Sequence, residues 1–182
     1  MSALPGRTEA DVQSALAAVM DPELPFLSIV DLGIVGTVEV GPGRVRVELL
    51  PTFVGCPALD LIRDTVVERL TELAPDADIG VEVSFAPPWT SDRISEEGRR
   101  QLRLHGFAPP ERLHDGGTTA ASPWLGSATA SATTAILLLR RVPCPHCGSR
   151  RTELENVFGS TLCRAIHHCS DCHQPFEQFK PV

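Results

Sequence analysis

Two Cys-x-x-Cys motifs near the end of the chain constrain its fold more than any other feature. Cys144 and Cys147 form the first motif, Cys169 and Cys172 form the second, and twenty-one residues separate them. Each motif can form a tight turn that presents two sulfur atoms, so two facing turns make a tetrahedral site of four sulfur ligands. The separation slightly exceeds the usual spacing of about 15–20 residues, which a longer hairpin absorbs. We therefore predict a zinc-ribbon-like β domain over residues 136–182.

A bound metal would also stabilise a domain as small as this one. Residues 136–182 are close to the smallest length that buries enough apolar surface to fold unaided. Structural zinc supplies an apparent binding free energy of about 10–16 kcal/mol. Four thiolates also suit rubredoxin-like iron or an iron–sulfur cluster, and cysteines can be buried without any metal. Zinc is the metal we expect.

Other thiol and imidazole groups lie close to the two motifs. Cys163 is interpreted either as a packed thiol of the ribbon or as an additional thiol with a redox or transfer role. The neighbouring histidines are spare ligands, so a different set of four is open, but we expect them to face solvent: His146, His167, His168 and His173.

Charge and hydropathy exclude several classes of function. The 182 residues include 16 basic and 23 acidic side chains, for a net charge of −7. An acidic chain of this kind lacks the broad basic face that nucleic-acid binding needs. The apolar run over residues 135–139 is too short to span a membrane, and no secretory signal is visible at the start. We expect a cytoplasmic protein that binds neither nucleic acid nor membranes.

The part of the chain before the ribbon alternates between helical and strand patterns. Residues 8–110 predict a small α+β domain of order α-β-β-α-β-α with a three-stranded sheet, in which a Gly-Pro-Gly turn at 41–43 joins the first two strands. Residues 111–135 are mostly small and polar and predict a linker. The expected elements are helices over 8–20, 57–74 and 95–105 and strands over 34–40, 44–50 and 79–85.

Cys56 stands alone, between a predicted strand and a predicted helix. A thiol at a helix N-terminus meets the positive end of the helix dipole, which lowers its pKa and favours the thiolate. Gly55 frees the turn, and Pro57 fits the first position of a helix. A single cysteine is also often a small buried hydrophobic side chain. The spacing leaves both interpretations open.

Three carboxylates lie in a short segment upstream of Cys56. Asp21, Glu23 and Asp31 could supply oxygen ligands or accept hydrogen bonds, but turn and capping roles are commoner for such residues. No nucleophile lies beside a base in the sequence, and no glycine-rich phosphate-binding motif is present. The sequence therefore does not predict an enzyme.

Several of these segments resemble a known family. Asp21–Pro25, Asp31–Gly33 and Thr52–Pro57 resemble the signature of SufT-like iron–sulfur assembly domains, and Ser84–Thr90 resembles their last strand and the exit from it. The cysteine-rich segment at the end of the chain makes the resemblance to one two-domain family more specific. Together, residues 8–110 and 140–181 are similar to the D component of phenylacetyl-CoA epoxidases, the ring-1,2-epoxidases of aerobic phenylacetate breakdown.

The resemblance implies a non-catalytic maturation or assembly factor with a zinc ribbon that docks clients. Cys56 would handle iron or an iron–sulfur cluster transiently, with Thr52 beside it and the carboxylates Asp21, Glu23 and Asp31 shaping or lining its site. The implied partners are the di-iron oxygenase or the iron–sulfur reductase of the epoxidase complex. One cysteine cannot complete a cluster's ligand set, so a homodimer or a client-shared site is expected. A structural subunit and an electron-transfer component with iron in the four-cysteine site stay open as alternatives.

Overall fold

The computed structural model describes residues 8–53, 55–112 and 141–180. These residues divide into two compact units. The first unit runs to Trp89 and includes Arg93–Gln101, whereas the second comprises Thr90–Asp92 and the residues from Leu102 onward. Helix α3 (Glu96–Leu104) therefore carries the chain from one unit into the other.

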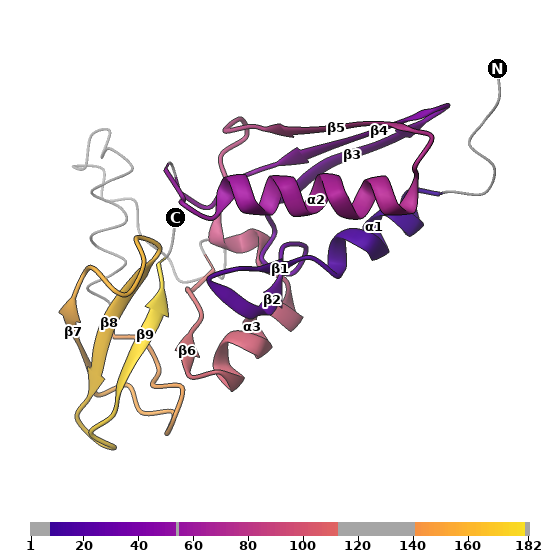
Figure 1. Cartoon of the computed structure of the whole chain (residues 1–182). Coiled ribbons are helices and arrows are strands. Elements are labelled where there is room, and N and C mark those ends of the chain that lie inside the picture. The colour runs from indigo at the N-terminus through magenta and orange to yellow at the C-terminus, as the bar shows by residue number, and fades with distance from the viewer. Residues whose placement is uncertain (1–7, 54, 113–140, 181–182) are drawn as a thin grey trace, which may run out of the picture. The chain divides into compact units, whose positions relative to one another are not determined.

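The first unit is built on a three-stranded sheet of order β3-β4-β5. Strands β3 (Val35–Gly41) and β4 (Arg44–Leu49) form an antiparallel hairpin, and β5 (Asp78–Val83) pairs with β4 in parallel. Helix α2 (Leu59–Leu73) connects the two parallel strands and lies along the sheet (Figure 1). The α+β class and the three-stranded sheet predicted from the sequence are confirmed.

Alternation along β4 and helical spacing along α2 create the core of this unit. Val45, Val47 and Leu49 are buried, while the intervening residues of β4 are more exposed. Helix α2 buries Ile62, Val66 and Leu70, which are four residues apart and so share one helix face. Burial of each such side chain stabilises the fold by about 1.5–3 kcal/mol.

The first helix is shorter than its sequence pattern predicts. Helix α1 (Glu9–Ala17) begins at the Thr8 cap, whose hydroxyl accepts a hydrogen bond from the Asp11 N–H. The predicted helix to residue 20 is wrong at its end, because a hairpin of β1 (Met20–Asp21) and β2 (Leu24–Ser28) follows. The Asp21 carboxylate closes this hairpin by accepting the N–H groups of Glu23 and Leu24, at 2.8 and 2.9 Å.

Helix α2 also begins later than predicted. Its first residue is Leu59 and its N-cap is Ala58, whereas the sequence suggested a start at Pro57. A tight turn takes the place of the missing helical residues, in which the Leu59 N–H donates to the Cys56 carbonyl at 3.2 Å. Cys56 thus lies three residues before the helix rather than directly at its end.

The second unit contains a four-stranded sheet of order β6-β9-β8-β7. Its strands are β6 (Phe107–Ala108), β7 (Thr152–Asn156), β8 (Arg164–Cys169) and β9 (Pro175–Phe179). The last three form an antiparallel meander, and the unpredicted β6 joins β9 in parallel. The residues buried together in this unit are Ala108, Val142, Cys144, Cys169 and Phe176.

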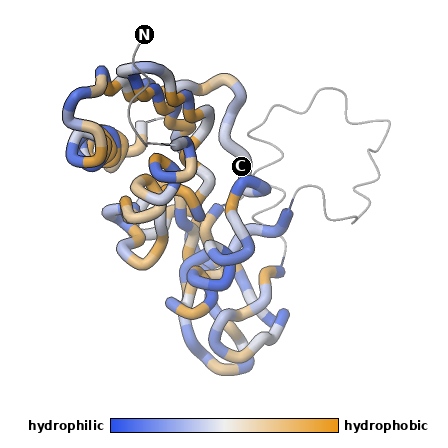
Figure 2. The backbone as a smooth tube through the Cα atoms, turned by 90° about the vertical axis from the view of Figure 1, so that its right-hand side faces the viewer, coloured by the Kyte–Doolittle hydropathy of each residue, from blue (hydrophilic) through white to orange (hydrophobic). Residues whose placement is uncertain are grey.

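Most of the predicted linker, residues 113–135, lies outside the described residues, as do residues 136–140 at the start of the predicted ribbon domain. The domain limits at 110 and 135 stay predictions. Apolar residues occur in short stretches along the tube in Figure 2. Among the described residues, no helix is long and apolar enough to cross a membrane.

Candidate functional site

The four cysteines of the two Cys-x-x-Cys motifs converge in the second unit. Their sulfur atoms all lie within 4.8 Å of one another. Cys144 Sγ is 3.7 Å from Cys172 Sγ, and Cys147 Sγ is 3.6 Å from Cys169 Sγ. A tetrahedral zinc ion with Zn–S bonds of about 2.3 Å requires sulfur atoms about 3.8 Å apart. The arrangement therefore fits a single tetrahedral metal ion.

The backbone of each motif forms the same turn. The Gly148 N–H donates to the Cys144 carbonyl at 2.8 Å, and the His173 N–H donates to the Cys169 carbonyl at 2.9 Å. Both residues have positive φ angles, 75° at Gly148 and 59° at His173. A second hydrogen bond closes each turn. The Cys144 N–H donates to the Ser149 carbonyl at 2.9 Å, and the Cys169 N–H donates to the Gln174 carbonyl at 3.1 Å. These bonds set the position of the two cysteines within each motif.

The cluster is asymmetric in burial. Cys144 and Cys169 are buried, Cys172 is half-buried and Cys147 is exposed. A hydrogen bond from the Cys172 N–H, together with those of the neighbouring thiols, lowers the pKa of Cys169 to about 7. A lowered pKa favours the thiolate, which is the form of cysteine that binds a metal ion.

The sequence suggested that the nearby histidines all face solvent, but one of them is buried. His146 and His173 are exposed and His168 is half-buried, but His167 is only 1% exposed. His167 lies two residues before Cys169 on β8, so both side chains point to the buried face. Its ring stacks on Phe176 and hydrogen-bonds to the Gln178 side chain at 2.9 Å, and burial lowers its pKa.

Cys163 is not part of the four-sulfur cluster. It is half-buried, and its sulfur lies 3.1 Å from the Thr161 hydroxyl. The Cys163 carbonyl accepts the Lys180 N–H at 2.8 Å, just before β8 begins. Its role as an additional thiol stays a prediction.

In the first unit, the family-like segments meet at one edge of the sheet. Val35 at the start of β3 pairs with Leu49 at the end of β4, and Leu49 pairs with Val83 at the end of β5. The segment 31–33 leads into β3, the Cys56 loop leaves β4 and the segment 84–90 leaves β5. All three segments therefore begin or end at the same edge.

The loop that carries Cys56 is a tight turn whose residues 55–57 are exposed or half-buried. Gly55 has a φ of 85°, which only glycine adopts without cost, and its surroundings leave open space around it. The Cys56 N–H donates to the Phe53 carbonyl at 3.3 Å. Cys56 is half-buried between the exposed residues Gly55 and Pro57, whereas Thr52 is buried. Cys56 is thus partly exposed on a constrained backbone.

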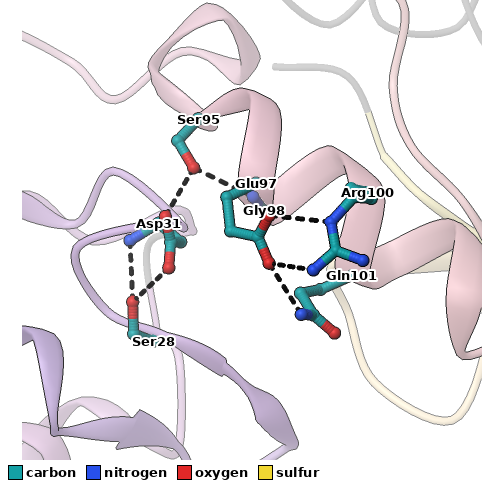
Figure 3. A network of polar contacts seen from close by, with 7 residues as sticks. All are labelled: Ser28, Asp31, Ser95, Glu97, Gly98, Arg100 and Gln101. Carbon is teal, nitrogen blue, oxygen red and sulfur yellow. Dashed lines mark hydrogen bonds and ion pairs between the residues drawn. The ribbon is translucent and has the colours of Figure 1, made fainter.

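Asp31 joins two distant segments at this edge (Figure 3). Its carboxylate accepts the hydroxyl of Ser28 at 2.8 Å and the hydroxyl of Ser95 at 2.6 Å. Ser95 in turn caps α3, because its Oγ accepts the Gly98 N–H at 2.9 Å. A side chain at Gly98 would come within 2.7 Å of the Asp31 carbonyl oxygen. Asp31 therefore anchors the start of α3.

The two residues after Asp31 extend the same anchor. The Leu32 carbonyl accepts the indole N–H of the buried Trp89 at 3.0 Å. The Gly33 carbonyl accepts the Arg93 Nε at 2.9 Å, and any side chain at Gly33 would collide with the Arg93 backbone. Segment 31–33 thus holds Trp89 and Arg93 at the sheet edge. The sequence predicted a helix over 95–105, but not the contacts of Ser28, Ser95 and Gly98 with Asp31.

The carboxylates and Cys56 do not form a second metal site in the part of the chain that the structure describes. There, the four-cysteine cluster is the one group of three or more Cys, His, Asp or Glu side chains positioned to hold a metal ion. Asp21 closes a turn, Asp31 anchors α3, and Glu23 is a half-buried residue of the β1–β2 turn.

Comparisons with known proteins match both parts of the chain. The family model described as "Iron-sulfur cluster assembly protein" matches residues 9–83, and that described as "PaaD zinc beta ribbon domain" matches residues 128–180. A protein of Escherichia coli (strain K12), named as the D component of 1,2-phenylacetyl-CoA epoxidase, is 32% identical over 94% of this chain and 92% of its own. An "Fe-S protein maturation auxiliary factor" of Porphyromonas gingivalis is 34% identical over 53% of this chain and 91% of its own.

Among solved structures, a DUF59 domain from Bacillus anthracis aligns with a TM-score of 0.48 and 32% identity, over 52% of this chain and 90% of that chain. Fold, site and matches define a two-part protein, in which an iron–sulfur-assembly-type α+β domain precedes a metal-binding zinc β ribbon. The chain belongs to the family of the 1,2-phenylacetyl-CoA epoxidase D component.

Proposed function

We propose that this protein is a non-catalytic maturation factor that delivers iron or an iron–sulfur cluster to a subunit of a phenylacetyl-CoA epoxidase. One observation carries the proposal. Cys56 lies half-buried on a constrained turn, at the sheet edge where segments 31–33 and 84–90 also meet, in a domain that matches iron–sulfur assembly proteins. Relatives named as maturation auxiliary factors support this role over a catalytic one.

The chemistry is ligand exchange at the Cys56 sulfur. The Cys56 thiolate forms an Fe–S bond as a ligand of the iron donor leaves the iron. A thiolate or carboxylate of the client later binds the iron, and the Cys56 thiolate leaves. No electron is transferred in either step. One thiolate holds iron weakly, which suits a carrier, and a second copy of the chain or the client supplies the remaining ligands. The cargo thus leaves when a better ligand set is offered.

In this proposal the carboxylates hold the loops around Cys56 in place. Asp21 keeps the β1–β2 turn closed, and Asp31 fixes the start of α3. Thr52 and Glu23 are proposed to line the space near Cys56. These groups shape the cargo site rather than bind a resident metal.

Zinc is the metal that we propose for the ribbon. Four cysteine ligands with no histidine form the closed geometry of structural zinc sites, and the sulfur separations of 3.6 and 3.7 Å suit the Zn–S bond length. The ion would stabilise the second unit, whose buried core contains two of its ligands. The ribbon then presents a fixed surface to client proteins. Six free thiols suit a reducing compartment, and we propose the cytoplasm.

The test compares Cys56→Ser with Cys163→Ser in cells that lack the native chain but make the epoxidase subunits. Cys163 is a matched control because it is also a half-buried free thiol outside the four-cysteine cluster. We expect Cys56→Ser to lower epoxidase activity at least about tenfold and Cys163→Ser to keep it. Iron and sulfide contents of the purified oxygenase and reductase identify the client. Full activity with Cys56→Ser would refute the proposal and favour a structural subunit.

A further inference from the structure

Two arginine pairs flank the first Cys-x-x-Cys motif, Arg140–Arg141 before it and Arg150–Arg151 after it. Three of these arginines, Arg141, Arg150 and Arg151, line one pocket of about 460 Å³ in the second unit. Glu111 is the fourth described residue that lines it. The fold therefore collects cationic side chains that are ten residues apart in the sequence.

The metal-binding turn explains why these arginines meet. The Thr152 hydroxyl donates to the Val142 carbonyl at 2.7 Å, and this bond is buried. The Cys144 N–H donates to the Ser149 carbonyl at 2.9 Å. These two bonds hold the segments before and after the turn side by side. The backbone that carries the arginines is therefore held next to the four-cysteine cluster.

The charges around the pocket are only partly balanced. Arg151 forms an ion pair with Asp171, which also accepts the Ser149 hydroxyl. Arg141 and Arg150 are exposed and make no ion pair within the described part of the chain. Like charges around one space repel each other, and an anion in that space relieves the repulsion. This surplus is notable in a chain with a net charge of −7.

The pocket also has the chemistry of carboxylate recognition. A guanidinium group presents paired N–H donors that match a carboxylate in a bidentate fashion. Three of the four described lining residues are arginines, and the fourth is Glu111. Several guanidinium groups spread around one pocket suit several carboxylates on one chain.

We propose that this pocket binds an acidic peptide segment of a partner protein through Arg141 and Arg150. The inference rests on the client-docking role proposed for the ribbon and specifies what the ribbon recognises. It does not depend on Cys56. The two can fail separately, because the pocket is tested by binding and the Cys56 proposal is tested by client activation.

The test is fluorescence anisotropy with a labelled hexaglutamate peptide and the zinc-loaded full chain at low salt. The double variant Arg141→Gln/Arg150→Gln is compared with Arg63→Gln/Arg69→Gln, which removes the same charge from α2. Zinc content and circular dichroism check that both variants fold.

We expect the pocket variant to bind hexaglutamate about tenfold more weakly and the α2 variant to bind within about twofold of wild type. Binding should also weaken less steeply with salt in the pocket variant. Equal loss in both variants, or binding of hexaglutamine as tight as that of hexaglutamate, would overturn the proposal. A single-stranded hexanucleotide that binds more tightly than hexaglutamate would overturn it too, in favour of nucleic acid.

Discussion

Gly148 and His173 occupy equivalent positions in the two metal-binding turns. Each follows the second cysteine of its motif, has a positive φ, and donates its N–H to the carbonyl of the first cysteine. The left-handed backbone costs glycine nothing but costs other L-residues about 1 kcal/mol. The second turn therefore contains a strain that the first turn lacks.

This difference predicts opposite effects of two substitutions. His173→Gly should stabilise the zinc-loaded protein by about 0.5 kcal/mol, because relief of the strain exceeds the added entropy of the unfolded chain. Gly148→Ala should destabilise it by about 0.5–1 kcal/mol, since a side chain there meets open space and the backbone strain exceeds the entropy lost by the unfolded chain. Urea unfolding measures both changes. A loss of stability in His173→Gly would contradict the interpretation.

The close approach of Gly98 to Asp31 should stabilise the packing of α3. Gly98→Ala should destabilise the protein by about 1–3 kcal/mol, because its Cβ would lie 2.7 Å from the Asp31 carbonyl oxygen. Ser95→Ala should cost about 1–2 kcal/mol through loss of the helix cap and of the 2.6 Å bond to Asp31.

Thermal unfolding of these two variants is compared with that of Gly43→Ala, at a turn glycine with no atom near its missing side chain. The positive φ of Gly43 makes this control sensitive to backbone strain alone. Protease cleavage after Arg99 or Arg100 should rise in Gly98→Ala and not in Gly43→Ala. Equal cleavage in the two variants would show that the close approach to Asp31 does not hold α3.

Removal of the ribbon metal should unfold the second unit. Two of the four sulfur ligands belong to its buried core, and without a cation no metal–sulfur bonds hold the two turns together. A chelator under reducing conditions should abolish near-ultraviolet circular dichroism from the second unit, and zinc should restore it. Cys147→Ser, which alters the exposed ligand, should reproduce the loss, whereas Cys163→Ser should not. A chelated protein with unchanged spectra would contradict a structural metal.

The ion pair between Glu177 and Arg164 predicts a pH dependence of stability. Burial raises the pKa of Glu177, but hydrogen bonds from Ser160 and the Arg164 guanidinium at 3.0 Å outweigh it and lower the pKa. A carboxyl with a lowered folded-state pKa adds stability above its unfolded pKa of about 4.3, and this stability is lost as pH falls through the folded-state value.

The free energy of unfolding of Glu177→Gln should therefore be about 1–3 kcal/mol below wild type near neutral pH, and the difference should shrink below about pH 4.3. Comparing the two proteins at each pH cancels the effect of acid on the metal site. A difference that stays constant down to about pH 2 would show that the carboxylate charge is not responsible.

The sequence predicted the parts of this molecule that depend on local pattern. Alternation in residues 44–49 and helical spacing from Ile62 to Leu70 give β4 and α2 directly, and the Cys-x-x-Cys spacing predicts the four-sulfur cluster. The end of α1 was missed because the side chain of Asp21 closes a turn, which apolar periodicity does not reveal.

Contacts between distant residues were the hardest to predict. The Ser95–Asp31 bond spans 64 residues, and β6 pairs with a strand near the end of the chain. Burial of His167 follows from its phase with Cys169 on β8, but the strand had to be placed before that phase could be used. Such features depend on tertiary packing, so residues near one another in the sequence give little sign of them.

Metal reconstitution shows whether Cys56 binds iron. Wild type, Cys56→Ser and Cys163→Ser are purified without oxygen and incubated with ferrous iron and sulfide. Zinc, iron and sulfide are then measured per chain, together with the absorption spectrum. We expect one zinc in all three proteins, and iron only in wild type and Cys163→Ser. Iron uptake by Cys56→Ser equal to that of wild type, or no uptake by wild type, would contradict this expectation.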